Sequence, residues 1–339
     1  MKKIKFSSDD EIRTKLRFFY ISFIFLELFV IFIILSLFVK PVLGGVGTNV
    51  TVITRLDVGN VYPEVIVVDI NSGASNFILN PNSTSRLTCT GLLRDYNNDT
   101  DITNVSAYWF HNSTSESNGS DDNNLHYTNA SCSIVRSYAG NFYGVPDDDY
   151  MALGNCTFDT WFYADPGVWN CTLVAVDSTN WNATNSSRVN LNSLLAIGLP
   201  DDMSYGTVNS TYVSGENYSN VTNVGNTKVN LSLYGYARYV GDNLAMNCTQ
   251  GATKNISVEY EGYNLTMSTG GAIPYSQFNT YYTNLSGSPV VKKFDLEYRR
   301  NDNYNEAVNA TYWRIFVPIG VAGSCQGNIV FGATTATGT

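Results

Sequence analysis

An apolar run near the N-terminus, from Phe18 to Val39, constrains this chain more than any other feature. The run is 22 residues long and holds one ionisable residue, Glu27. A helix rises about 1.5 Å per residue, so a run of this length can cross a hydrocarbon core of about 30 Å. Six Lys or Arg residues precede the run, and cytoplasmic flanks carry the positive excess. The sequence therefore predicts a membrane span with residues 41–339 outside the cytoplasm.

Two interpretations of this run remain open. It could be a signal peptide that is cleaved near Val42-Leu43-Gly44, but signal peptides have apolar regions of about 7–15 residues. We favour an uncleaved signal-anchor at 18–40 behind a basic cytoplasmic tail at 1–17. The Ser8-Asp9-Asp10-Glu11 stretch resembles a capping box, which predicts a helix start near Asp9. Pro41 and the following glycines are expected to end the helix.

The charge of the long C-terminal part excludes several classes of partner. Residues 41–339 hold 13 basic and 25 acidic residues, and an acidic surface repels phosphate backbones. No glycine-rich loop follows a strand and opens a helix, as a nucleotide site would require. The sequence thus predicts no nucleic-acid partner and no nucleotide partner, and the membrane is the first partner that it predicts.

Cysteines and glycosylation motifs also indicate an exported protein. All six cysteines follow the apolar run, and an even number in an exported region is typical of disulfides. No CxxC or Cys/His cluster accompanies them, so a zinc site is unsupported. Twenty Asn-x-Ser/Thr motifs, far more than composition explains, predict N-linked glycans at surface positions. Their asparagines are Asn49, Asn82, Asn98, Asn104, Asn112, Asn118, Asn129, Asn155, Asn170, Asn182, Asn185, Asn209, Asn217, Asn220, Asn230, Asn247, Asn255, Asn264, Asn284 and Asn309.

The hydrophobic pattern beyond residue 45 is that of an all-β protein. Apolar and polar residues alternate with period two over several short runs, which Gly, Asn, Asp and Pro clusters separate. Examples are Val50–Val58, Val229–Leu233 and Trp313–Val317. We therefore predict two β-sandwich domains, over residues 46–193 and 194–339.

The first of these domains resembles an immunoglobulin-type sandwich. Cys89 lies in an early strand, Trp109 in the next, and Asp165–Cys171 opens a late strand with Trp169 two residues before its cysteine. Trp169 stands where the family usually has a corner tyrosine. The DYxxxxDI and YADPGxWxC stretches (95–102 and 163–171) are similar to those of exported surface glycoproteins of archaea.

The immunoglobulin resemblance implies a disulfide arrangement. It implies that Cys89 pairs with Cys171 between the sheets, which leaves Cys132 and Cys156 as a local pair. Cys248 and Cys325 would then pair within the second domain. The four cysteines of the first domain allow three pairings, so this arrangement stays a hypothesis at this point. A crosslink from Cys171 to Cys248 would contradict the division into two domains.

One loop has the residue spacing of a calcium ligand set. The oxygen-bearing residues Asp95, Asn97, Asp99 and Asp101 alternate, as in loops that wrap hard cations. Thr100 and Ser106 stand where an EF-hand requires Gly and Glu, so a solvated connection between strands is the alternative. A second acidic cluster, 147–149, is expected to be a polar loop tip. Apart from this weak calcium set and the N-linked glycans, the sequence predicts no cofactor and no metal.

Nothing in the sequence indicates catalysis. The only histidines, His111 and His126, lie in loop-like sequence without a nucleophile motif, so we expect no enzyme activity. Two tyrosine-rich stretches, 275–282 and 298–304, would either stack on sugars and partners or pack within the sheets.

These features together predict a membrane-tethered, heavily N-glycosylated structural protein of the cell surface, such as an envelope, filament or stalk component. An adhesin or receptor ectodomain that binds a sugar or a partner protein is the alternative. Self-association is also expected. If the anchor were removed, residues 46–60 could add a strand to an open sheet edge of a neighbouring subunit. Otherwise these residues would form the first strand of their own sandwich.

Overall fold

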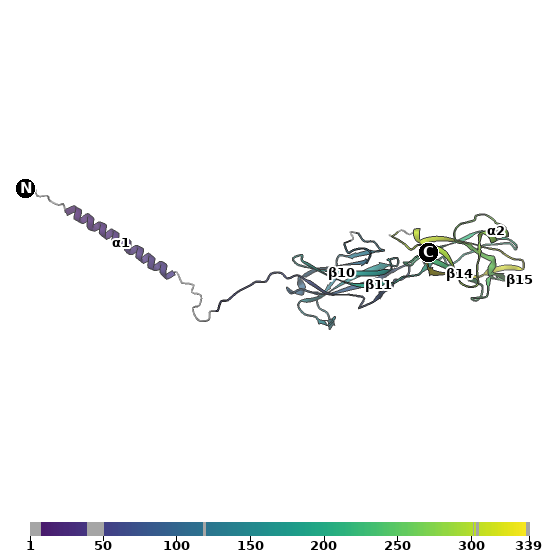
Figure 1. Cartoon of the computed structure of the whole chain (residues 1–339), viewed down its shortest axis with the longest axis horizontal. Coiled ribbons are helices and arrows are strands. Elements are labelled where there is room, and N and C mark those ends of the chain that lie inside the picture. Colours follow the sequence, from purple (N-terminus) through teal and green to yellow (C-terminus); the bar gives the residue numbers. More distant parts are fainter. Residues whose placement is uncertain (1–7, 39–50, 118–119, 301, 303–304, 337–339) are drawn as a thin grey trace, which may run out of the picture. The chain divides into compact units, whose positions relative to one another are not determined.

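The structure is a computed structural model that describes all residues except 1–7, 39–50, 118–119, 301, 303–304 and 337–339 (Figure 1). The chain divides into two units, Met1–Gly59 and Asn60–Thr339. Pro41, the following glycines and the motif asparagines Asn49 and Asn118 lie outside the described residues.

The first unit contains a single described helix, α1, over Ser8–Phe38 (Figure 1). The helix starts one residue before Asp9, as the capping pattern predicts. Its segment Lys15–Leu35 has a mean hydropathy of 2.7 and is long and apolar enough to cross a membrane. The side chains described along this segment are exposed to the surroundings, so the protein itself provides no apolar cover for them.

The chain between α1 and the sheets is not a strand, and the prediction of a first strand there is wrong for the described residues 51–60. Three apolar side chains of the expected face remain uncovered: Val52 is 75%, Leu56 85% and Val58 76% exposed. The sequence alternates as a strand does, but a strand also needs a neighbouring strand for its backbone hydrogen bonds. The backbone of residues 51–60 forms no such pairing in the structure.

The first sandwich consists of two sheets. The four-stranded sheet has the order β1-β3-β9-β6 and the five-stranded sheet the order β2-β11-β10-β4-β5. All pairings are antiparallel except the short β2–β11 contact. The strands are β1 (Glu64–Ile70), β2 (Asn76–Phe77), β3 (Thr84–Arg94), β4 (Ile102–His111), β5 (His126–Asn129), β6 (Ser133–Val135), β9 (Met151–Trp161), β10 (Gly167–Asp177) and β11 (Asn182–Leu191), and a small hairpin pairs β7 (Asn141–Phe142) with β8 (Val145–Pro146).

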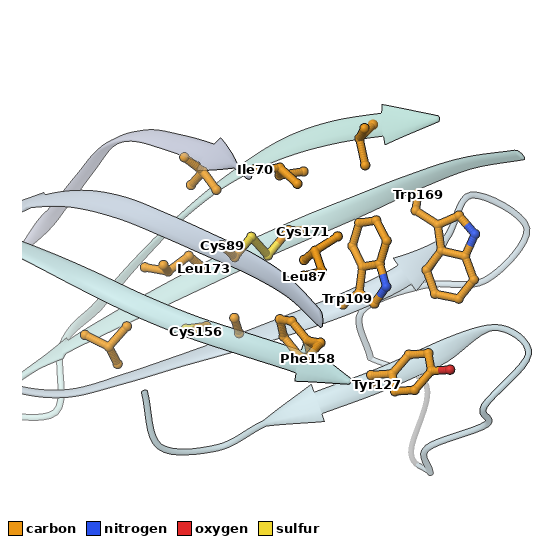
Figure 2. Packing of buried hydrophobic residues seen from close by; sticks show 14 of the residues in the cluster. Ile70, Leu87, Cys89, Trp109, Tyr127, Cys156, Phe158, Trp169, Cys171 and Leu173 are labelled. Atoms are coloured by element: carbon orange, nitrogen blue, oxygen red, sulfur yellow. A yellow bond between two sulfur atoms is a disulfide. The ribbon is translucent and has the colours of Figure 1, made fainter. Parts of the chain in front are cut away.

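The core of this sandwich surrounds the disulfide between Cys89 and Cys171, as Figure 2 shows. Trp109 and Trp169 are fully buried and stack with their ring centroids 4.9 Å apart. Trp109 lies directly opposite Cys171 in the β4–β10 pairing. The indole N–H of Trp169 donates to the backbone oxygen of Asp165 at 2.8 Å. That hydrogen bond ties the strand to the preceding turn, a connection that the corner tyrosine usually provides.

The remaining strands form a second sandwich of three small sheets. Their orders are β12-β13-β20-β17-β18, β19-β14-β22 and β16-β15-β21. Trp313 and Leu231 belong to its main core and are fully buried. The strands are β12 (Ile197–Gly198), β13 (Asn217–Asn223), β14 (Val229–Tyr236), β15 (Leu244–Gly251), β16 (Asn255–Ser257), β17 (Glu261–Asn264), β18 (Thr283–Asn284), β19 (Val290–Leu296), β20 (Val308–Ile315), β21 (Val321–Gln326) and β22 (Asn328–Thr335).

Among the described residues beyond α1, only short helices interrupt the sheets. They are the 3-10 turns η1 (Asp99–Asp101), η2 (Val258–Tyr260) and η3 (Asn305–Ala307) and the helix α2 (Tyr275–Tyr281). The protein is therefore all-β, with two immunoglobulin-like β-sandwiches that follow an N-terminal apolar helix.

Candidate functional site

Three carboxylates from two distant parts of the chain meet at one end of the first sandwich. Asp95 follows β3, Asp101 ends η1, and Asp177 is the last residue of β10. One oxygen of each lies within 4.8 Å of the others. The β4–β10 pairing brings them together, because Asp177 is opposite Ile102, the residue after Asp101. Asp95 and Asp177 are buried and Asp101 is half-buried.

The hydrogen bonds of this cluster are unevenly distributed. Asp177 Oδ1 accepts from the backbone N–H groups of Thr179 and Trp181, each at 2.8 Å, and its Oδ2 accepts from Asn60 Nδ2 at 2.6 Å. Asp95 Oδ1 accepts from the N–H of Asn97 at 2.8 Å. In contrast, Asp95 Oδ2 and Asp101 Oδ2 are buried and have no hydrogen-bond partner in the structure.

The electrostatics of the cluster follow from burial and from charges of one sign. Burial raises the pKa of Asp95, and the neighbouring charges of Asp101 and Asp177 raise it further, against the hydrogen bond from Asn97. The hydrogen bonds to Asp177 outweigh its desolvation, so its pKa lies below the usual range. Among the described residues, no Lys or Arg forms an ion pair with any of the three.

The predicted calcium set is therefore only partly brought together. The side-chain oxygen of Asn97 accepts the N–H of Val61 at 2.7 Å. Asp99 is buried beside a different group of charges, those of Arg136, Asp147 and Asp149. Burial raises the pKa of Asp99 and Arg136 counteracts this effect. The spacing argument found Asp95 and Asp101 and missed Asp177. Asp99 is not part of the group of three carboxylates, and the side-chain oxygen of Asn97 accepts a backbone N–H.

The cysteines form the three disulfides that the sequence predicts. Cys89–Cys171 joins the two sheets of the first sandwich, and Cys132–Cys156 joins β9 to the segment before β6. Cys248–Cys325 connects directly opposite residues of β15 and β21. No described cysteine is free.

The motif asparagines share one property. None of the eighteen that the structure describes is buried, whereas three asparagines outside such motifs, Asn124, Asn223 and Asn226, are. In each motif that contains a cysteine the asparagine is half-buried and the cysteine is buried, as expected when successive side chains of a strand face opposite sides. The threonine is exposed in two of these motifs, whereas Thr172 is buried.

A groove runs along β22 in the second sandwich. Its volume is about 380 Å³, and β22 forms the end of its three-stranded sheet, so one of its edges has no strand partner among the described residues. Ser219 and the buried Glu261 contribute polar groups to the groove. Its apolar lining comes mainly from Leu199, Met203, Tyr205, Met246, Ile329 and Phe331.

The histidines and the tyrosine-rich stretches make local contacts. His111 Nδ1 lies 2.7 Å from Ser113 Oγ, and His126 Nδ1 lies 3.2 Å from Asp121 Oδ1. The first tyrosine-rich stretch forms α2, which the sequence did not predict. The second begins at the buried Tyr298, whose hydroxyl donates to Asp165 Oδ1 at 2.8 Å.

Comparisons with known proteins extend this description only slightly. No family model matches the chain, and no curated protein matches it. A chain of the chaperone–tip adhesin complex of CFA/I fimbriae biogenesis is 13% identical over 75% of this chain and 76% of that chain, with a TM-score of 0.29.

Two further solved structures are similar at the same level. The C-terminal domain of the antigen I/II polypeptide BspA of Streptococcus agalactiae is 9% identical over 81% of this chain and all of that chain, with a TM-score of 0.21. Titin Ig tandem domains A164–A165 are 9% identical over 81% and 98%, also with a TM-score of 0.21. Values this low carry no argument about function, and the fold assignment rests on the strands described above.

Proposed function

We propose that this protein is a membrane-tethered, N-glycosylated structural protein of the cell surface that assembles into an envelope, filament or stalk. The observation that carries the proposal is the position of the glycosylation motifs, since none of the eighteen described motif asparagines is buried. A glycan can be attached only to an asparagine that solvent reaches. If the motifs had no function, some of their asparagines would be buried, as some of the asparagines outside the motifs are. The resemblance to archaeal surface glycoproteins agrees with this assignment.

The N-terminal helix and the disulfides support the same location. Its span Lys15–Leu35 is apolar and exposed, and Arg13, Lys15 and Arg17 lie at its N-terminal end. That arrangement favours a cytoplasmic N-terminus and an exterior C-terminal part. Disulfides persist outside the cytoplasm, and all six cysteines are paired.

Self-association by strand donation is the assembly mechanism that we propose. The acceptor is the unpaired edge of β22 in a second copy, and the donor is the segment 51–58. The donor is eight residues long and so is β22. Val52, Leu56 and Val58 lie on one face of an extended chain, and the half-buried Ile329 and Phe331 beside the groove offer an apolar surface for them.

The groove also supports the alternative, an adhesin or receptor that binds a sugar or a peptide. Its lining combines Tyr205 with the exposed carboxylates of Asp201 and Asp202, and aromatic rings with nearby polar groups are typical of such sites. Purified protein that binds a soluble ligand without forming ordered assemblies would favour this alternative.

The proposed protein is non-catalytic and has neither nucleic acid nor a nucleotide as a partner. The local contacts of both histidines support the first point, since neither is placed beside a nucleophile and a buried acid in the described chain. The excess of acidic over basic residues beyond the membrane span supports the second.

The location and the glycans can be tested together on cells that produce the full chain. We expect protease added to intact cells to remove the C-terminal part, and peptide mass spectrometry to find glycans on exposed motif asparagines such as Asn182 and Asn220. Asn124 and Asn223 serve as internal controls, because they lie outside motifs and must be unmodified. Protection of the C-terminal part in intact cells, together with its loss after lysis, would contradict the proposal.

A further inference from the structure

The acidic cluster of the first sandwich has a charge arrangement that calls for a cation. Asp95, Asp101 and Asp177 place three carboxylate oxygens within 4.8 Å of one another, and Asp95 and Asp177 are 0% and 1% exposed. Buried charges in proteins are normally paired, hydrogen-bonded or bound to metal. No basic side chain among the described residues pairs with these three.

The unpartnered oxygens are a second and independent indication. Asp95 is completely buried, its Oδ1 is occupied by the N–H of Asn97, and its Oδ2 has no partner. Asp101 Oδ2 is also buried without a partner. Buried polar atoms are hydrogen-bonded in the large majority of cases, and an ion is one of the explanations for an exception.

We propose that a calcium ion binds between Asp95, Asp101 and Asp177. Hard divalent cations take oxygen ligands, and calcium accepts irregular sets of carboxylates, carbonyls and waters, whereas magnesium requires near-ideal octahedral geometry. The three ligands come from three separate elements at the end of a sandwich, which is an irregular set of this kind. Calcium sites of extracellular modules bind with dissociation constants of about 10⁻⁴ to 10⁻³ M.

The position of the site assigns it a role. The chain enters the first sandwich across the cluster, because Asn60 Nδ2 donates to Asp177 Oδ2 and the N–H of Val61 donates to Asn97 Oδ1. The next residue, Tyr62, stacks on Trp181 with ring centroids 4.0 Å apart. A calcium ion that neutralises the carboxylates therefore stabilises the contacts of residues 60–62 with the first sandwich. Without the ion, the repulsion between the carboxylates weakens these contacts.

Titration of the full chain in detergent tests the site. After removal of metal with a chelator, calcium chloride is expected to raise the melting temperature and to bind with a dissociation constant between about 10⁻⁴ and 10⁻³ M in calorimetry. Magnesium chloride at the same concentration should have a much smaller effect. Calcium should also slow hydrogen exchange of the Val61 amide, measured on a peptide that covers residues 59–63.

The variants Asp95→Asn, Asp101→Asn and Asp99→Asn separate the proposed ligands from the spacing motif. Loss of a ligand should weaken calcium binding about 10-fold or more for Asp95→Asn and Asp101→Asn. Asp99→Asn is the matched control from the same loop and should bind as the natural chain does. If Asp95→Asn does not fold, Asp101→Asn still decides, because that residue is half-buried. Absence of calcium binding at 10 mM to the natural chain, or an equal loss in Asp99→Asn, would overturn the proposal.

Discussion

At the scale of single residues, Glu261 is the carboxylate whose burial has the clearest consequence for stability. Its side chain is 2% exposed, and Oε1 accepts a hydrogen bond from the hydroxyl of Tyr205 at 2.8 Å. Burial raises the pKa of Glu261 to about 7, against the smaller lowering effect of this hydrogen bond. The native protein therefore keeps a proton that the unfolded chain releases at a lower pH.

The free energy of unfolding should respond to pH accordingly. Because the native state binds the proton more tightly, protonated Glu261 contributes to the free energy of unfolding at low pH. This contribution falls as pH rises from about 4.5 to 7 and stays lost above that range. The loss amounts to about 3 kcal/mol at most. Glu261→Gln keeps an acceptor without a charge, so it should stabilise the protein at pH 8 and change little at pH 4.5.

Urea unfolding of the full chain at the two pH values measures this difference in the free energy of unfolding. The contributions of other titrating groups cancel when the variant is compared with the natural chain at the same pH. Glu259→Gln is the matched control, because Glu259 is exposed two residues away. An unchanged midpoint for Glu261→Gln at pH 8, or an equal shift in both variants, would show that the burial argument is wrong.

The acidic cluster shows how far residue spacing can be used for prediction. Asp95 and Asp101 lie six positions apart, so alternation along one loop was enough to select both. Asp177 joins them only through the pairing of β10 with β4, which the local spacing does not contain. Asn97 and Asp99 also have suitable oxygens, but the oxygen of Asn97 accepts a backbone N–H, and Asp99 lies beside a different group of charges, which includes Arg136.

At the scale of elements, the disulfides differ in what they join. Cys89–Cys171 links β3 of one sheet to β10 of the other across 82 residues, whereas Cys132–Cys156 links positions 24 residues apart. In the chain-entropy model the longer loop stabilises the fold by about 4–5 kcal/mol and the shorter one by about 3 kcal/mol. Removal of the first also leaves a cavity between buried aromatic residues.

We therefore expect the double variant Cys89→Ala/Cys171→Ala to lose more stability than Cys132→Ala/Cys156→Ala. Chemical unfolding of each full chain, followed by the fluorescence of the buried tryptophans, gives both differences. The local pair is the matched control, since it removes the same atoms from the same sandwich. If Cys132→Ala/Cys156→Ala lost more stability, chain entropy and core packing would not determine which disulfide contributes more.

Period-two alternation predicted many strands but not their pairing. It identified Val229–Leu233 within β14, which buries alternate side chains. It also identified Trp313–Val317, of which β20 contains only Trp313–Ile315, and all three of these residues are buried. It also marked residues 51–58, which have the same alternation but no neighbouring strand among the described residues. The helix α2 was missed because its tyrosines also suit strands, and only Phe278 of its seven residues is buried.

At the scale of the whole molecule, two buried asparagines form hydrogen bonds between the two sandwiches and with the chain that connects them. Asn226 is fully buried, accepts from the N–H of Leu194 at 2.6 Å, and donates to the backbone oxygen of Ala164 at 2.9 Å. The side chain of Asn124 donates in the same manner to the backbone oxygens of Tyr163 and Arg299. These contacts join residues of both sandwiches within the second unit, which favours a second unit that moves as one piece in an assembly.

Strand donation is the prediction that belongs to this scale. An extended chain over 51–58 directs Val52, Leu56 and Val58 to one side and Ile53 to the other. If the first side enters the groove beside β22, Leu56→Asp places a charge in an apolar contact and should abolish assembly of the full chain. Ile53→Asp makes the same chemical change on the opposite side and should leave assembly intact.

Electron microscopy and light scattering of the two purified variants distinguish the cases, and the melting temperature of each shows whether the monomer still folds. Both residues are exposed in the structure, Ile53 by 79% and Leu56 by 85%, so neither change should unfold the monomer. If the Leu56→Asp variant still assembles, or if both variants fail to assemble equally, then a donated strand with Leu56 directed into the groove is excluded. Collapse of the monomer in Leu56→Asp would instead indicate that the segment completes its own sandwich.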